Sequence, residues 1–337
     1  MKNKLQFDVL DNVGCFIYPE ERFSSVADEF DELLNTYQSG NMSEKYYIAE
    51  LEQLIAREPE FIDSHAHLSF AFHRQGKPKK ALDAALAGVA IGECLIPEGF
   101  HGVIEWGYLE NRPFLRALHG VVLAYMRLRR HKDAASFIDK MLAYNPNDNQ
   151  GIRYLLGSET LRAGDKIRAE TVLNENADNY PPYYYELGLL HIMNDDWVKA
   201  ATALRQGFCA NIYLAELLCG NSDPLPLTIW HDSNLAQPDT ATDYMKMYGN
   251  LWFRYPDSFA FLRWLFNHSS VMAERASLMK CHEELFSEKD FEARKRISNR
   301  KQMLLNGIDN RLSTEIVKKI KDRHGQEFWP WIQSLGW

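Results

Sequence analysis

LRALHGVVLAYMRLRRHKDAASFIDKMLAYNPND, residues 115–148, is the stretch that decides the fold of this chain. Its first half carries apolar residues such as Leu118 and Val121 at helical spacing. Ala134 opens the second half, and Pro146 closes it. Small side chains let two helical backbones approach, and proline ends a helix. The stretch therefore predicts a pair of helices that pack against each other.

The same pattern recurs along the chain. Alanines equivalent to Ala134 stand at 81, 169 and 200, so successive spacings are about 53, 35 and 31 residues, close to the period of about 34 residues that a tetratricopeptide (TPR) repeat has. Residues 115–148 closely resemble such a repeat, although Arg129 stands where a turn glycine is common. Further helix pairs are expected over residues 20–57, 62–95, 149–180 and 181–220.

The resemblance implies a fold and a domain organisation. We expect an all-α protein with a TPR-like α-α superhelix, a helical solenoid, followed by a helical region without repeats. An insertion at 93–114 is too rich in glycine for a plain helix, and it should form a loop on one face of the array. The expected parts are an N-terminal segment with the first helix at 1–42, repeats at 43–220, a proline-containing linker at 221–238, and a helical C-terminal region at 239–337.

The C-terminal region shows helix signals without the repeat spacing. Capping and acidic first-turn residues predict several helices there. We expect them at 240–253, 256–266, 271–285, 290–306 and 314–323. The chain then ends in a run of aromatic residues, in which Trp329, Trp331 and Trp337 are expected to cap the hydrophobic end of the stack.

Some phrases of the sequence are similar to ones found in bacterial TPR proteins of unassigned activity. The family implies an interaction scaffold or adaptor that binds a peptide or a helix in its concave groove, and it implies no reaction. When the groove positions of a TPR unit are carried over, the candidate binding residues are Phe70, Arg74, Arg116, His119, Met126, Arg127, Arg153, Tyr185 and Met193.

This set combines cations with adaptable apolar side chains. It suits a protein or peptide segment that is apolar and carries an acidic group or a C-terminal carboxylate. The alternative is that the arginines are solvated, or that they pair with acids of the insertion such as Glu105 or Glu110. The chaperone-tail clamp requires lysine and asparagine at fixed positions, where Ala66, Phe70 and Leu123 stand here. Binding of chaperone tails is therefore not expected.

Composition narrows the class of protein further. The formal net charge is −8, which argues against a general nucleic-acid binder. We find no apolar run long enough to span a bilayer and no secretory signal at the first residues. The five cysteines are scattered and odd in number, as expected of free thiols in a reducing compartment. A cytoplasmic protein that does not enter a membrane is the expectation.

No catalytic motif is found, so we expect neither an enzyme nor a bound cofactor or metal. The phrase beginning at His282 starts like a zinc-protease helix, but Phe286 stands where the second histidine ligand belongs. Two other readings stay open. One is an enzyme or small-molecule site in the C-terminal region near the linker, with His231 and Asp232 as its acid–base pair. The other is a helical RNA-binding repeat. Separately, the basic run at 294–296 in the C-terminal region could contact RNA or an acidic protein.

Overall fold

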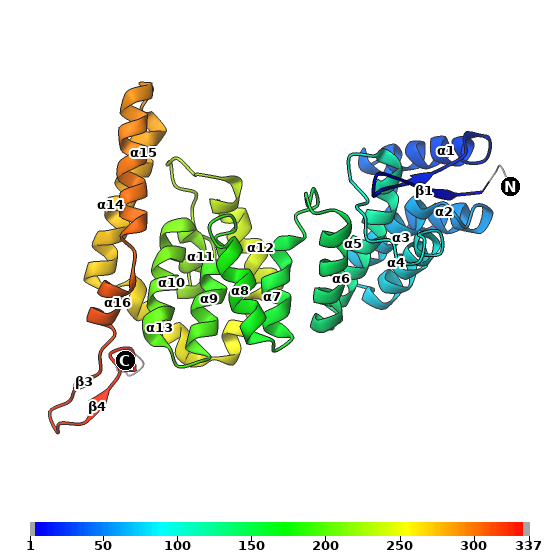
Figure 1. Cartoon of the computed structure of the whole chain (residues 1–337). Helices are drawn as coiled ribbons and strands as arrows, with labels where there is room; N and C mark the ends of the chain where they lie inside the picture. Colours follow the sequence, from blue (N-terminus) through cyan, green and yellow to red (C-terminus); the bar gives the residue numbers. More distant parts are fainter. Residues whose placement is uncertain (1–3, 333–337) are drawn as a thin grey trace. The chain divides into compact units, whose positions relative to one another are not determined.

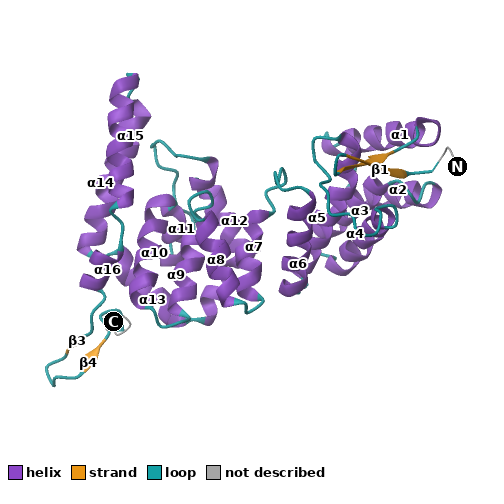
Figure 2. Ribbon diagram, in the orientation of Figure 1, coloured by secondary structure: helices purple, strands orange, loops and turns teal. Residues whose placement is uncertain are grey.

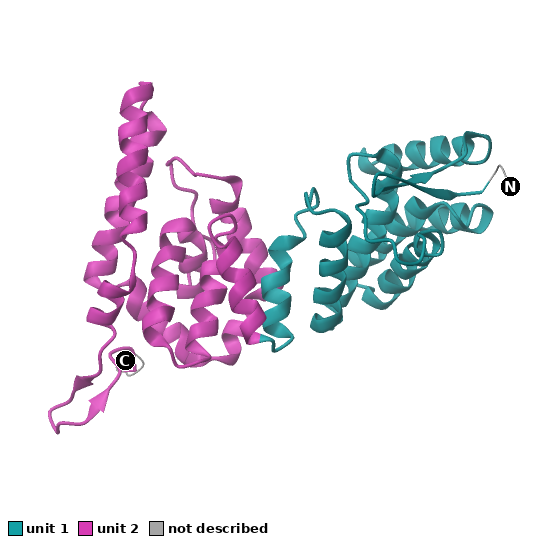
Figure 3. Ribbon diagram, viewed as in Figure 1, with its two compact units in different colours: residues 1–165 teal, residues 166–337 magenta. Residues whose placement is uncertain are grey.

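The computed structural model describes residues 4–332 of the chain. In this range the chain forms sixteen α-helices, and its strands are confined to two short hairpins (Figures 1 and 2). None of these helices combines the length and the apolar composition that crossing a membrane would require. The predicted all-α class is confirmed. The chain divides into two compact units, residues 1–165 and 166–337, which are coloured separately in Figure 3.

Unit 1 holds an N-terminal hairpin and the first seven helices. Its elements are β1 (Gln6–Leu10), β2 (Val13–Ile17), α1 (Glu20–Gln38), α2 (Glu44–Arg57), α3 (Ile62–Arg74), α4 (Pro78–Glu93), a 3-10 turn at Leu109–Asn111, α5 (Arg112–Arg127), α6 (His131–Tyr144) and α7 (Arg153–Arg162). Helix α3 packs on both α4 and α5, and α5 packs on α6. Helix α3 therefore contacts its own partner, α4, and also the first helix of the next pair, α5.

Small residues make this close packing possible. Ala81 and Ala134, the residues expected at the helix crossings, are fully buried. Gly120 lies where α5 packs tightly against α3, because a Cβ added there would stand 2.8 Å from Oγ of Ser69. The small residues that recur in the sequence thus lie where the helices pack against each other.

The turn after the first helix of each pair recurs in the same form. It places one residue in the left-handed region of backbone conformation, at Gly40, Gly76, Arg129, Gly164 and Asp195. The amide that follows donates back to a carbonyl five residues earlier, as Lys77 does to Phe72 and Arg130 does to Tyr125. This is the Schellman arrangement that ends many helices.

The β1–β2 hairpin has no counterpart in the sequence-based prediction. Its two strands pair antiparallel, with Gln6 opposite Ile17. Asp11 and Asn12 form the connection and both have positive φ, 48° and 67°, which suits a two-residue hairpin turn. The strands are only five residues long, so the period-2 pattern is too short to separate from the surrounding sequence.

The insertion holds this hairpin against the helices. The amide of Gly14 donates to the carbonyl of Val103 at 2.8 Å, so β2 pairs with a residue of the insertion. Asn111 is fully buried, and its side chain accepts from the amide of Phe16 while it donates to the carbonyls of Gly14 and Glu105. One asparagine therefore connects the hairpin, the insertion and the start of α5.

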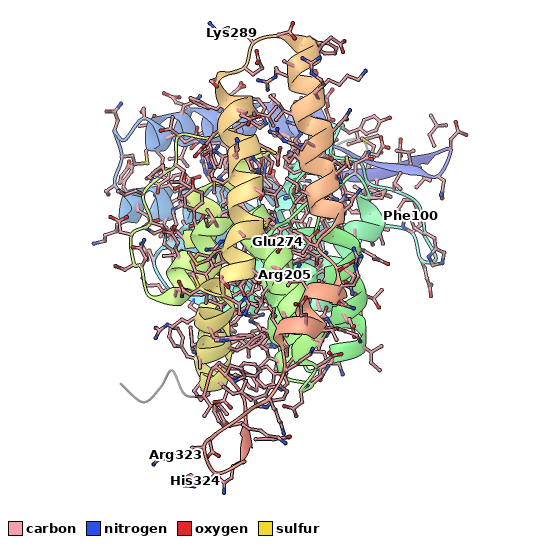
Figure 4. The ribbon with its side chains drawn as sticks, turned by 90° about the vertical axis from the view of Figure 1, so that its left-hand side faces the viewer. Phe100, Arg205, Glu274, Lys289, Arg323 and His324 are labelled. Carbon is pink, nitrogen blue, oxygen red and sulfur yellow. The ribbon has the colours of Figure 1, made fainter. Side chains whose placement is uncertain are left out.

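Unit 2 contains the remaining elements. They are α8 (Lys166–Asn176), α9 (Pro182–Ile192), α10 (Trp197–Ala210), α11 (Ile212–Cys219), a 3-10 turn at Asn234–Ala236, α12 (Pro238–Tyr248), a 3-10 helix at Gly249–Arg254, α13 (Pro256–Phe266), α14 (Ser269–Ser287), α15 (Phe291–Asn306), α16 (Asn310–Ile316), β3 (Ile320–Lys321) and β4 (Glu327–Phe328). Helices α14 and α15 form a long antiparallel pair, and Figure 4 labels Lys289 at the connection between them.

The last helix expected from the sequence is wrong. The sequence predicts a helix over 314–323, but α16 ends at Ile316 and is followed by the β3–β4 hairpin. Asp322 begins the hairpin turn, because its carboxylate accepts from the amides of His324 and Gln326. Gly325 completes the turn with φ +79°. This local hydrogen bonding competes with a helix, and Figure 4 shows His324 at the end of the turn.

Two clusters organise the interior of unit 2. Arg205 of α10 is almost wholly buried and donates to Glu274 of α14 at 2.6 and 3.0 Å, and Figure 4 shows the two side chains together. The second cluster is aromatic. Trp331 is buried among Trp197, Phe261 and Trp329, with ring centroids 4.7–4.9 Å apart. The third terminal tryptophan, at position 337, lies outside the described residues.

Candidate functional site

Seven of the nine predicted groove residues belong to unit 1. We call them the α3–α5 face: Phe70 and Arg74 of α3, Arg116, His119, Met126 and Arg127 of α5, and Arg153 at the start of α7. Contacts link neighbouring members. The rings of Phe70 and His119 lie 6.2 Å apart, and Nε2 of Gln150 donates to Nδ1 of His119 at 3.2 Å. Phe70 of α3 and His119 of α5 thus meet on this face, and Gln150, in the loop before α7, contacts the same histidine.

Arg116 is held by an acid of the neighbouring helix. Its guanidinium donates to both carboxylate oxygens of Asp63, at 2.6 and 2.8 Å. The carboxylate of Asp63 is only 12% exposed, and Trp106 of the insertion lies over the guanidinium at 5.8 Å. The partner of Arg116 is therefore Asp63 of α3, and neither of the insertion acids that the sequence suggested forms this ion pair.

Two other arginines of the face are paired as well. Arg74 donates to Glu44 of α2 at 2.8 Å and lies over the ring of Tyr37. Arg153 donates to Asp148 at 2.8 Å. The same carboxylate accepts from the backbone amides at the start of α7, so this ion pair is part of the helix start. Much of the positive charge expected for a ligand is thus already neutralised.

Arg127 differs from the other arginines of the face. It lies exposed in the last turn of α5, and among residues 4–332 it forms none of the ion pairs. Met126 beside it is half-buried. His73 of α3 is close to Arg127, whose charge contributes to a lowered pKa of that histidine, although burial is the larger cause. Arg127 is therefore the arginine of this face that is available to an external anion.

The histidines on this side of unit 1 are held neutral. Burial lowers the pKa of His119 to about 4, and the nearby His73 adds to the decrease. Burial also lowers the pKa of His67, whose Nδ1 hydrogen-bonds the hydroxyl of Tyr47 at 3.0 Å. Near pH 7 these imidazoles carry hydrogen-bonding groups but no charge.

The two predicted groove residues of unit 2, Tyr185 and Met193, differ in whether they reach the surface. Tyr185 is wholly buried, and its hydroxyl donates to the carbonyl of Asn211 at 2.5 Å, so it is wrong as a surface contact. Periodicity identified an apolar helix face, but α9 is buried on almost every side. Met193 is half-buried at the end of α9, where its carbonyl accepts from Lys166.

The region around the expected linker packs within unit 2. The side chain of Asn211 donates to the carbonyls of Leu235 and Gln237, and the amide of Trp230 donates to the carbonyl of His282. These hydrogen bonds hold Trp230, Leu235 and Gln237 against α11 and α14. The segment is a packed connection through most of its second half.

His231 and Asp232 are adjacent in sequence but have different partners. Nε2 of His231 lies 2.8 Å from the hydroxyl of Tyr213, while the carboxylate of Asp232 is paired with Lys301 of α15. Asp232 and Lys301 line a polar recess of about 540 Å³, and His282 lines it as well. The arrangement separates the supposed acid–base pair, so it does not favour the catalytic reading of these two residues.

Comparisons with known proteins do not assign this geometry. Among the described residues, no group of three or more histidine, cysteine, aspartate or glutamate side chains is placed to hold a metal ion. No protein-family model matches the chain, and no curated protein matches its sequence.

Two acids that neutralise arginines of the α3–α5 face were not predicted from the sequence. Glu44 lies at the start of α2, and Asp148 lies in the loop before α7. Neither occupies a groove position of a repeat, so the repeat pattern contains no signal for them. Asp148 has positive φ, 50°, and a run of Asn and Asp residues around it was the available sign of a specialised turn.

Proposed function

We propose that this chain is a TPR-like helical-repeat protein whose α3–α5 face binds a segment of another protein. The repeated left-handed turn, at positions such as Gly76 and Arg129, supports the TPR-like reading. So does the packing of α3 on both α4 and α5. Repeat arrays of this kind present residues from successive helices to an extended ligand.

The observation that carries the proposal is the character of the side chains on this face. Phe70, His119 and Met126 are half-buried, so each combines a fixed position with an exposed surface. Methionine adapts its shape to a partner, and aromatic rings provide large contact area at low entropic cost. Neutral imidazoles allow an apolar segment to dock without burying a charge.

The ion pairs narrow the chemistry of the partner. Arg74, Arg116 and Arg153 are occupied by acids of this chain, so a strongly acidic segment has little to bind. Arg127 is the exception. We therefore propose a mainly apolar peptide or helix that carries one acidic side chain or a C-terminal carboxylate placed to meet Arg127. The free state of the five cysteines supports a reducing, cytoplasmic location for this binding.

Selection from a peptide display library tests the proposal directly. Purified full-length chain should enrich apolar sequences with one acid. The double variant Phe70→Ala with Met126→Ala should lower the affinity of an enriched peptide about tenfold or more, because it removes two central contacts. Arg127→Glu should lower it about fivefold or more and remove the preference for the acid.

Matched controls separate binding from folding. Ile167→Ala removes an 84% exposed apolar side chain of α8, and Lys132→Glu makes the same charge change as Arg127→Glu on α6. Both should leave the affinity unchanged. Enrichment of no peptide family, or equal affinity for the wild type and the Phe70–Met126 variant, would contradict the proposal.

A further inference from the structure

A recess in unit 1 has aromatic walls. It lies between the end of β2, α1, the start of α3 and the end of the insertion, and its volume is about 360 Å³. Tyr18, Phe23, Phe30 and Phe61 line it, and their rings contact one another, with centroids 5.2 Å apart for Tyr18 and Phe23 and 5.5 Å for Phe30 and Phe61. The volume is within the range of small-molecule sites.

The polar residues that line this recess are mainly acids. They are Glu20, Asp31, Asp63 and Glu110, and neither lysine nor arginine is among the residues that line it. Asp63 is neutralised by Arg116, but the carboxylates of the other three are exposed, and none of them is in an ion pair among residues 4–332. The recess is therefore negative at its rim and aromatic inside. We call it the acid–aromatic recess.

The hydroxyl of Tyr18, a residue that lines this recess, is unsatisfied within the described part of the chain. It is shielded from solvent and has no hydrogen-bond partner among residues 4–332. Burial raises the pKa of Tyr18 well above its usual range, and the neighbouring Asp63 raises it further, so the hydroxyl is neutral. A buried hydroxyl without a partner costs free energy, and a ligand donor that reached it would remove that cost.

We propose that the acid–aromatic recess binds an organic ammonium cation with an apolar body. The aromatic walls would contact the apolar part and the face of the cation, since ring faces attract ammonium groups. The carboxylates of Glu20 and Glu110 would provide the opposite charge, and the Tyr18 oxygen would accept from an ammonium N–H. This site is distinct from the α3–α5 face and does not rest on its binding a protein.

Titration calorimetry with 2-phenylethylamine tests the site on the full-length protein, with 2-phenylethanol and 3-phenylpropionate as the neutral and anionic analogues. The amine should bind about tenfold more tightly than the alcohol, and the acid should bind least. Chemical shifts should change around Tyr18 and Phe30. An arm with N-acetyl-lysine methylamide distinguishes the source of the cation: comparable binding would indicate a lysine side chain of a protein, and weaker binding a free amine.

Two variants make the proposal falsifiable. Glu20→Gln with Glu110→Gln should weaken amine binding about fivefold, whereas Asp28→Asn with Glu32→Gln, the same charge change at α1 residues that do not line the recess, should leave it unchanged. Tyr18→Phe should weaken binding about tenfold without lowering the melting temperature, because its hydroxyl has no partner in the free protein. Equal affinities for the amine and the alcohol would overturn the proposal. So would an unchanged amine affinity in both the Glu20–Glu110 variant and Tyr18→Phe.

Discussion

His119 shows what a single residue contributes on the α3–α5 face. It lies between the ring of Phe70 and the amide of Gln150, and burial lowers its pKa to about 4. Protonation would place a positive charge in a poorly solvated position and would remove the acceptor that Gln150 uses. His119 therefore adds no charge to the face near pH 7, and its lowered pKa makes the stability of unit 1 depend on pH.

The direction of this dependence follows from the two pKa values. In the unfolded chain His119 titrates near 6.5, so between about pH 6.5 and pH 4 the unfolded state binds more protons than the folded state. Its contribution is complete above pH 6.5 and is lost as the pH falls toward 4. We expect wild type to lose about 1–3 kcal/mol more than His119→Gln over this interval.

The free energy of unfolding of unit 1 can be measured at pH 7, 6, 5 and 4 by chemical denaturation of the full-length protein, with hydrogen exchange of unit 1 amides as the readout. His101→Gln is the matched control, because His101 is exposed in the insertion. It should show the pH slope of wild type. If His119→Gln also shows that slope, the proposed neutral state of His119 is wrong.

The first helix of each pair ends in a turn that requires one residue in the left-handed conformation. At Arg129 the backbone has φ +58°, where Gly76 and Gly164 stand in neighbouring turns with φ +68° and +89°. A side chain with a Cβ is strained in this conformation, whereas glycine adopts it freely. The hydrogen bonds of the turn require this left-handed conformation, so the fold tolerates the strain at Arg129.

Arg129→Gly should raise the free energy of unfolding by about 0.5–1 kcal/mol, because it removes the strain without removing a backbone hydrogen bond. Arg129→Ala keeps the Cβ and should show no such gain, while Gly164→Ala should lose about 1 kcal/mol. Urea denaturation compares the three variants. A loss of stability in Arg129→Gly would mean that the arginine side chain has a structural role which outweighs the strain.

At the largest scale each compact unit has its own means of connecting its helices. In unit 1 the buried Asn111 joins the hairpin to the insertion. In unit 2 the buried Arg205 donates to Glu274, to the carbonyl of Asp309 and to the hydroxyl of Ser313. The arginine thus ties α10 to α14 and α16. Without its anion, this charge would be buried and unpaired.

Glu274→Ala should therefore destabilise unit 2 by about 3–5 kcal/mol. Hydrogen exchange should show the loss of protection in α10, α14 and α16, with the amides of α3 and α5 as the internal reference. Glu283→Ala removes an exposed acid from the same helix and should change protection little. Unchanged protection in Glu274→Ala would show that the Arg205 network is not needed for the packing of unit 2.

The helices could be predicted closely where capping and periodicity agreed. The expected bounds 256–266 match α13, and α1 begins at Glu20 as expected. Prediction was poorer where one short hydrogen-bonded motif decided the outcome. The carboxylate of Asp322 redirected the chain into a hairpin, and Asp11 with Asn12 formed a turn between strands too short to show a pattern.

The candidate site was less predictable than the fold. Repeat spacing placed Phe70, His119 and Met126 on one side of unit 1, but the same reasoning put the buried Tyr185 on the surface. Spacing identifies which residues share a face of a helix. It carries no information on how deeply that face is covered by other elements, and α9 is covered on almost every side.

The sequence by itself determined the helical class and the recurrence of helix pairs, because periodicity, small residues and caps act over a few turns of chain. Only the tertiary structure decided which charges remain available. Asp63 and Arg116 are 53 positions apart and form one ion pair, while Tyr18 meets Phe61 across a recess with no sequence signature. Side chains that far apart are brought together by packing, and packing depends on the whole unit.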